Sequence, residues 1–125
     1  MRMIGQLAQI LIALGIFNVW VLRFNRSTGY RGGSADSLRG EFAAYGLPSW
    51  AMYVVGALKI SLAIALVVGL WIPVLVLPAA LGMGVLMVGA LAMHFKIGDS
   101  AKKSLPAVVM LLLSIVVAVA HGAVR

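Results

Sequence analysis

The chain divides into four long apolar runs separated by short polar connections. The runs cover about residues 3–22, 51–70, 74–94 and 105–122, and none alternates apolar with polar residues as a half-buried strand would. Each run is long enough to cross a hydrocarbon core about 30 Å thick, which needs about 20 helical residues. The pattern predicts an all-α integral membrane four-helix bundle, organised as a single domain over residues 1–125.

The only long connection, the polar loop 23–50, has two parts of different composition. Its first part is basic and rich in glycine, whereas residues 37–45 place three apolar or aromatic side chains on one side of a short helix. Such a helix would lie in the interface or re-enter the bundle between the first and second spans. Gly46 and Pro48 then end it before the second span begins.

Composition supports a membrane location and excludes other classes. The chain is 63% hydrophobic and 10% charged, against about 45–50% and 25% in a typical soluble domain. Its net charge of +7 does not indicate nucleic-acid binding, because the basic residues flank the spans and no soluble module would present them. No small-residue cleavage site follows the first run, which disfavours a removed signal peptide. The lack of cysteine excludes disulfides and thiolate-bound metal.

The basic residues predict an orientation. Lysine and arginine concentrate in the first and third connections, while Arg2 and Arg125 stand at the ends of the chain. Because short loops rich in basic residues stay on the cytoplasmic side, these two connections are predicted to be cytoplasmic and both termini outside. The expected location is the bacterial cytoplasmic (inner) membrane.

Small residues recur every fourth position on the second span, with a shorter series on the third. In hydrocarbon the hydrophobic effect does not drive helices together, so close packing through small residues has to contribute. Packing within the bundle is the favoured interpretation, and a dimer interface is the alternative. The predicted helix-packing residues are Ala57, Ser61, Ala65, Gly69, Ala80 and Gly84.

Lys59 is the most informative residue of the sequence. Counted from the start of the second span, it lies roughly 12 Å deep, close to the bilayer centre. None of the three acidic residues lies inside a predicted span, so Lys59 has no counterion there. It could simply pack against a loop carboxylate or backbone carbonyls. Otherwise a re-entrant loop brings Glu41 to it, desolvation leaves it neutral, or a ligand with an anionic or carbonyl group occupies the site.

Several polar residues share one half of the bundle with Lys59, because the first and third spans end, and the second begins, on one membrane side. A cationic, partly buried pocket there would hold a lipid headgroup, a quinone carbonyl or an anion, with His94 as a proton donor. For each arginine taken singly, an interfacial anchor is the alternative. The predicted ligand-binding residues are Lys59, Arg23, Arg26, Asn18, His94, Lys96, Glu41 and Tyr45.

The chain contains no nucleophile, base and acid constellation, Walker loop or zinc signature. His94 and His121 are predicted about a membrane thickness apart, which excludes a shared metal site. Neither a catalytic nor a metal site is therefore predicted. An enzymatic role would need a cofactor or a partner subunit.

Five short motifs stand out along the chain: EFAAYGLPSW at residues 41–50, VGALK at 55–59, GLWIP at 69–73, MVGALAMHFKIGD at 87–99 and KSLPA at 103–107. Together they resemble the DoxX-like family of small membrane proteins. The likeness covers nearly the whole chain and implies a four-helix membrane protein. Because the family is named for a small subunit of a thiosulfate:quinone oxidoreductase, it also implies a quinone-linked redox or accessory role.

The sequence is compatible with three functions. The leading hypothesis is an accessory subunit of a membrane redox system that binds a quinone or lipid-like ligand near Lys59. The alternative is a non-enzymatic scaffold or assembly factor that packs against a membrane protein partner through the second span. A small transporter is the weakest, since four short helices leave little room for a pathway unless the protein forms a homo-oligomer. All three share the lipid bilayer as partner.

Overall fold

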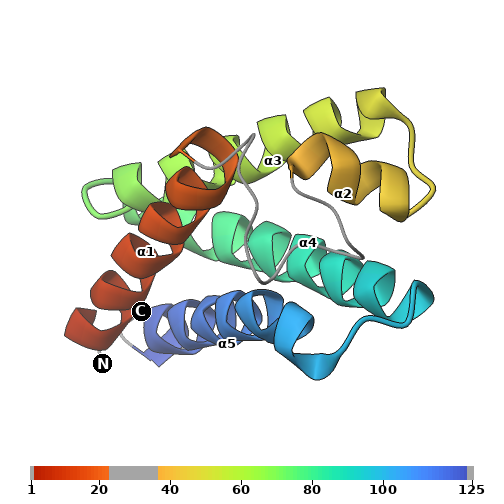
Figure 1. Ribbon diagram of the computed structural model, residues 1–125. Coiled ribbons are helices and arrows are strands. Elements are labelled where there is room, and N and C mark those ends of the chain that lie inside the picture. Colours follow the sequence, from red (N-terminus) through yellow and green to blue (C-terminus); the bar gives the residue numbers. More distant parts are fainter. Residues whose placement is uncertain (1, 23–36, 124–125) are drawn as a thin grey trace.

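The computed structural model describes residues 2–22 and 37–123, and the regular structure in these ranges is entirely helical. Four helical segments are long and apolar enough to cross a membrane, which confirms the predicted fold class (Figure 1). The elements are α1 (Arg2–Phe17) with a π-helical turn at Asn18–Leu22, α2 (Leu38–Ala44), α3 (Ser49–Val68), a 3-10 turn at Pro73–Leu75, α4 (Val76–Lys96) and α5 (Ala101–Ala123).

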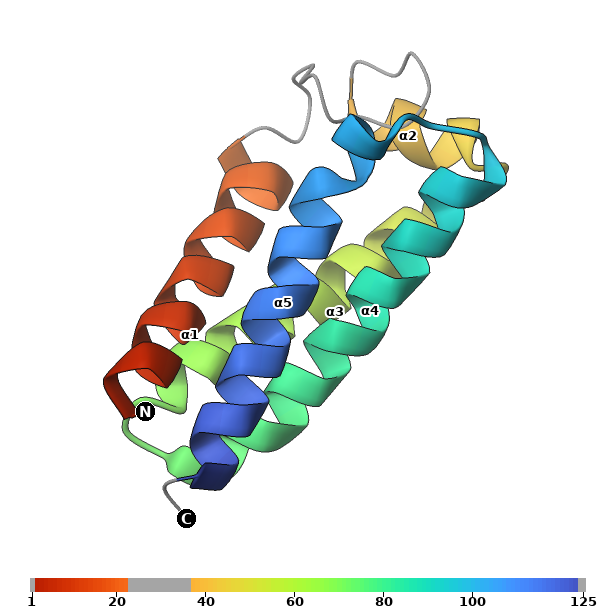
Figure 2. The same ribbon diagram turned by 90° about the horizontal axis from the view of Figure 1, so that it is seen from below.

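The four spans pack as a closed bundle. Helix α1 packs against α3 and α5, and α4 packs against the same two helices. Both marked chain ends lie at one end of the bundle, whereas α2 and the connection between α4 and α5 lie at the other (Figure 2). This arrangement gives the molecule two chemically different ends, called here the terminal end and the α2 end.

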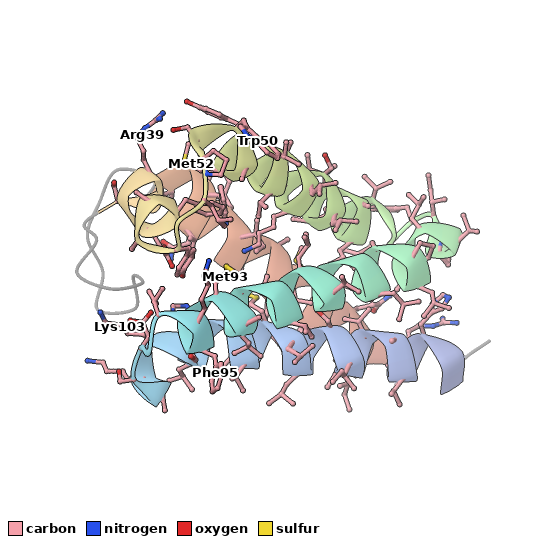
Figure 3. The ribbon with its side chains drawn as sticks, turned by 90° about the vertical axis from the view of Figure 1, so that its right-hand side faces the viewer. Arg39, Trp50, Met52, Met93, Phe95 and Lys103 are labelled. Carbon is pink, nitrogen blue, oxygen red and sulfur yellow. The ribbon has the colours of Figure 1, made fainter. Side chains whose placement is uncertain are left out.

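The core is apolar and small in relation to the outer surface. Its fully buried side chains come from all four spans and are Ile12, Met52, Leu66, Met83 and Val117. Many large apolar side chains point outward instead; Phe95 is 89% exposed and Trp71 76%. Such an outer surface fits hydrocarbon as its solvent. Figure 3 shows these outward side chains along the helices, with Arg39 and Trp50 at the α2 end.

Helix α2 confirms the predicted short helix between the first two spans. A helix of seven residues is unstable on its own, so its ends need capping groups. The Ser37 hydroxyl accepts a hydrogen bond from the Gly40 N–H at 3.1 Å. At the other end Gly46 adopts φ +78° and donates to the Ala43 carbonyl at 3.0 Å. Phe42, 8% exposed, then packs the helix onto the bundle.

Helix α5 starts earlier than the sequence pattern indicates. Its first residue is Ala101 rather than residue 105, so Pro106 lies inside the helix. Proline in a helix removes the bond to the carbonyl four residues earlier, here that of Lys102. Lys102 is exposed at the α2 end, where water can satisfy that carbonyl instead. Pro106 therefore lies near the start of the apolar run but does not interrupt the helix.

The small residues of α3 divide between the core and the outer face. Gly69 is buried, and a Cβ there would lie 2.7 Å from Val76. Ala65 is half-buried, whereas Ala57 and Ser61 are exposed. Only Ala65 and Gly69 therefore pack inside this bundle. Ala57 and Ser61 face outward, because the face of α3 that carries Lys59 is the one that faces the core.

The small residues of α4 face a neighbouring span. Ala80 is 1% exposed. A Cβ on Gly84 would stand in ordinary contact with Leu111 and Ser114 of α5. Gly84 therefore lies where α4 and α5 approach each other, and Ala80 is part of the buried core.

Candidate functional site

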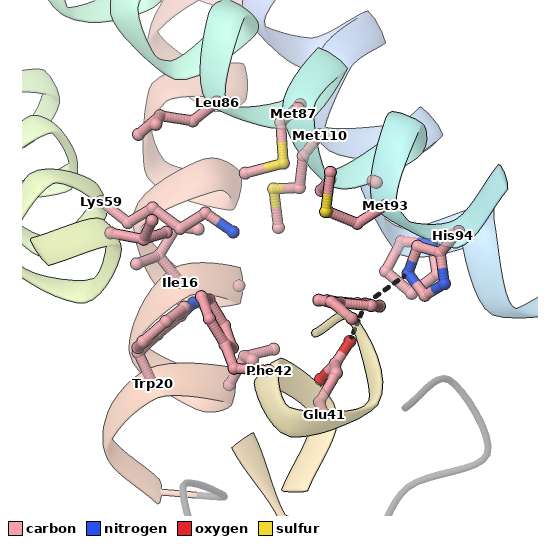
Figure 4. Close-up of a pocket in the computed structure, with 18 of the residues that line it drawn as sticks. Ile16, Trp20, Glu41, Phe42, Lys59, Leu86, Met87, Met93, His94 and Met110 are labelled. Atoms are coloured by element: carbon pink, nitrogen blue, oxygen red, sulfur yellow. Dashed lines mark hydrogen bonds between the residues drawn. The ribbon is translucent and has the colours of Figure 1, made fainter. Parts of the chain in front are cut away.

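A cavity of about 830 Å³ lies at the α2 end, among α1, α2, α3, α4 and α5. This volume falls within the range of about 300–1,000 Å³ typical of small-molecule sites. Most of its walls are apolar, with methionines from α4 and α5 and aromatic rings from α1 and α2 (Figure 4). A few polar side chains converge on it, as expected of a site that orients a ligand.

Lys59 extends from α3 into this cavity (Figure 4). Its Nζ lies 5.3 Å from the centre of the Trp20 ring, a cation–π distance. Glu41 lines the same cavity and acts on Lys59 through its electric field. Across residues 2–22 and 37–123, neither Glu41 nor any other group forms a hydrogen bond or ion pair with the Lys59 ammonium. Helix α2 thus brings Glu41 to the cavity without neutralising Lys59 by direct contact.

The aromatic wall beside Lys59 depends on a glycine in α3. The Trp20 ring lies against Gly56, where a Cβ would be only 2.7 Å from the ring carbon Cζ3. Phe42 meets Trp20 edge-on, with ring centres 5.9 Å apart and planes at 78°. A glycine three residues before Lys59, on the same helical face, is therefore what lets the indole approach the ammonium.

A chain of polar contacts runs from the connection after α4 to the cavity. His94 is only 5% exposed, and its Nδ1 lies 2.7 Å from Asp99 Oδ2. Its Nε2 lies 3.4 Å from the Tyr45 hydroxyl. That hydroxyl donates a hydrogen bond of 2.6 Å to Glu41 Oε1. The dashed lines of Figure 4 mark the two contacts of the hydroxyl.

The backbone after α4 places Asp99 beside His94. Gly98 adopts φ +71° and donates to the Phe95 carbonyl at 3.1 Å. The Asp99 N–H then donates to the His94 carbonyl at 3.0 Å. This pair of bonds is a Schellman turn, which folds the chain back over the last turn of the helix. The Asp99 side chain is 6% exposed as a result, although it lies in a connection.

Lysines join the elements around this chain of contacts. Lys96 Nζ donates to the Tyr45 backbone carbonyl at 3.0 Å and ties the end of α2 to α4. Lys103 of α5 places its Nζ 4.0 Å from Asp99 Oδ1 and is 29% exposed. Each lysine thus holds a member of the polar chain in place from a different helix.

The structure brings most of the predicted ligand-binding residues together. Asn18, Glu41, Tyr45, Lys59 and His94 line the one cavity. Lys96 stands behind them, bonded to the backbone of Tyr45.

The two predicted arginines, Arg23 and Arg26, lie outside the described residues. Sequence reasoning did not select Trp20, Phe42 or Asp99. The sequence could have predicted the role of Asp99. A glycine directly before an acid, shortly after the end of a helix, is typical of a Schellman turn, and such a turn brings the acid back beside His94. For Trp20 the sequence offered one indication only: Gly56 and Lys59 share a helical face, so that a bulky side chain packed on the glycine would lie beside the lysine.

A second cavity, of about 420 Å³, lies at the terminal end and is lined by His121 and Gln9. Gln9 Nε2 donates to the Leu66 carbonyl at 2.8 Å and so joins α1 to α3. The two histidines of the chain therefore line different cavities.

Comparison with known proteins finds a match to one protein family. The model of the DoxX-like family matches residues 8–117, which include all four spans in large part. No curated protein and no solved structure matches the chain.

Proposed function

The chain belongs to the DoxX-like family, and from this we propose that it binds a quinone or a similar lipid-like ligand beside Lys59. In that role it is an accessory subunit of a membrane redox system. Its proposed location is the bacterial cytoplasmic membrane, with both termini outside. The ligand enters from the bilayer, and electrons come from a partner protein.

One observation carries the proposal: the Lys59 ammonium reaches into an apolar cavity with no hydrogen-bond acceptor among the described residues. An ammonium offers three donors, and leaving them unused away from water costs free energy. A ligand carbonyl would accept one of these hydrogen bonds. The methionine and aromatic walls would accept a flat ring or an isoprenoid tail.

The charge balance of the cavity favours a neutral ligand over an anion. Glu41 lines the same space as Lys59, so an anionic group near the lysine would also meet a carboxylate. A neutral carbonyl compound avoids that repulsion and still accepts the hydrogen bond. Quinones combine such carbonyls with an apolar body, whereas a phosphate headgroup has the wrong charge for this pair.

The test is the ligand content of the Lys59→Met variant. Protein extracted in mild detergent is analysed by mass spectrometry for quinones and other lipid-soluble molecules. A hydrogen bond from a charged donor contributes about 1.5–3 kcal/mol, so the variant should bind the ligand roughly ten- to a hundredfold more weakly than the wild type and retain correspondingly less of it. Lys102→Met is the matched control, because Lys102 is exposed and does not line the cavity. Equal quinone content in Lys59→Met and Lys102→Met would refute the proposal.

A further inference from the structure

We propose that His94, Tyr45 and Glu41 form a proton relay that carries a proton from His94 to the Lys59 cavity. Asp99 is its positioning residue at the outer end, and Glu41 delivers the proton inside the cavity. The relay rests on the proposed function only for the identity of the group that receives the proton. Its geometry involves the protein alone.

The relay follows from the single hydrogen of the Tyr45 hydroxyl. Among the described residues, Glu41 Oε1 lies 2.6 Å and His94 Nε2 lies 3.4 Å from this hydroxyl, and it can donate to only one of them at a time. When it donates to Glu41, Nε2 must carry a proton of its own to bond the phenol oxygen. When it donates to His94, the Glu41 carboxyl must carry a proton instead. The two arrangements differ by one proton moved from His94 to Glu41.

The transfer conserves protons and charge. The Nε2–H bond of the His94 imidazolium breaks and that proton bonds to the Tyr45 oxygen, while the original hydroxyl proton passes to Glu41 Oε1. Tyr45 ends as a neutral phenol, His94 as a neutral imidazole and Glu41 as a carboxylic acid. The charges +1 and −1 become 0 and 0, and no electron moves. The 2.6 Å bond to Glu41 corresponds to the state before transfer.

Asp99 sets the direction of the relay. By accepting from Nδ1 at 2.7 Å, it keeps a proton on that nitrogen and leaves Nε2 for exchange with Tyr45. His94 and Tyr45 are each 5% exposed, so water competes little for their contacts. Lys103, partly exposed and 4.0 Å from Asp99, marks the outer end nearest to solvent.

Among the described residues, the charged groups at the cavity and beside His94 come from several elements. Glu41 belongs to α2, Lys59 to α3, Lys96 to α4 itself, Asp99 to the connection and Lys103 to α5. The field of these groups acts on His94, so substitutions have to separate the path through Tyr45 from the general field. Within this set, only Glu41 reaches His94 through a shared hydroxyl.

The test uses the two histidines of the chain as internal probe and control. The full chain is labelled with ¹⁵N-histidine, purified in detergent without added ligand and studied by NMR; His121→Asn assigns the signals. The spectra are compared at one fixed pH, where the ¹⁵N shift of Nε2 depends on whether that nitrogen carries a proton. Glu41→Gln should shift the His94 Nε2 signal when Tyr45 is present and should leave it unchanged in the Tyr45→Phe background, where the path through the hydroxyl is gone. His121 should be unchanged throughout.

Tyr53→Phe is the matched control, because its hydroxyl bonds Arg39 and lies outside the relay. It should leave the response of His94 Nε2 to Glu41→Gln in place. If that response persists in the Tyr45→Phe background, the coupling does not pass through the hydroxyl and the relay is wrong. A His94 signal that Glu41→Gln leaves unchanged overturns it as well, even if Tyr45→Phe does not fold. Because these spectra need no ligand, a negative Lys59→Met result and a negative relay result are told apart.

Discussion

Lys59 and Glu41 bring opposite charges into one apolar cavity without joining in an ion pair. Each buried charge costs several kcal/mol unless other groups compensate for the lost water. The Trp20 ring compensates in part on the lysine side, and the Tyr45 hydroxyl does so for Glu41. The open space between the two charges is therefore suited to a dipolar ligand that touches both.

Glu41→Gln should change which molecules occupy the cavity. Without the carboxylate, Lys59 alone determines the local charge, and anionic lipid headgroups should replace neutral ligands. A partly buried charge contributes about 1 kcal/mol, so the ratio of anionic lipid to quinone in purified protein should rise roughly fivefold. Quantitative mass spectrometry of the extracted lipids measures that ratio.

Asp99→Asn is the control for this change, since it removes a carboxylate that does not line the cavity. Its lipid ratio should match that of the wild type. An unaltered ratio in Glu41→Gln would mean that Glu41 does not select against anions, and the preference for a neutral carbonyl would lose its basis.

At the scale of the elements, the site depends on how closely α1 approaches α3. The Trp20 ring lies against Gly56, and Lys59 lies one helical turn further along the same face. One added methyl group at this point pushes the indole away from both Lys59 and Phe42. The α1–α3 contact therefore supports the cavity as well as the bundle.

Gly56→Ala should destabilise the protein although alanine favours helices. The new Cβ would lie 2.7 Å from the Trp20 ring, and overpacking of this kind costs about 1–3 kcal/mol. Gly89→Ala is the matched control, because a Cβ there meets nothing within 4 Å and should be neutral or stabilise by up to about 1 kcal/mol. Denaturant unfolding in detergent compares the two variants. Equal stability of both would show that Trp20 moves aside without cost.

The elements also show what sequence can and cannot predict here. Long apolar runs predict the spans well, since a bilayer leaves few other solutions for the backbone. Helix α5 begins before the apolar run, because the hydrogen bond that Pro106 removes falls where water is available. The shared end of Lys59 and His94 was predicted because helix direction alone fixes it, whereas Glu41 was expected there only if a re-entrant loop brought it to Lys59.

The remaining parts of the site depend on geometry that no apolar pattern encodes. Asp99 reaches His94 only through the positive φ of Gly98 and the two hydrogen bonds of that turn. Trp20 reaches Lys59 only because Gly56 leaves room for its ring. Both depend on a glycine, and a glycine in a sequence does not say which neighbour will use the space it leaves.

For the whole molecule, the two ends differ in composition. The α2 end holds the larger cavity, the polar chain of contacts and, among the described residues, Arg39, Lys96, Lys102 and Lys103. The terminal end holds Arg2 and a smaller cavity. Because basic residues in short connections remain cytoplasmic, the α2 end should face the cytoplasm, and the Lys59 cavity would lie on that side.

The orientation can be tested with cysteine labelling, because the natural chain contains no cysteine and gives no background. Ser100→Cys places a thiol in the connection after α4, and Gly122→Cys places one at the terminal end; both positions are exposed. A membrane-impermeant maleimide added to intact cells should label Gly122→Cys and should reach Ser100→Cys only after permeabilisation. The reverse pattern would place the cavity on the outer side. The cluster of basic residues would then be explained by the site itself and not by membrane insertion.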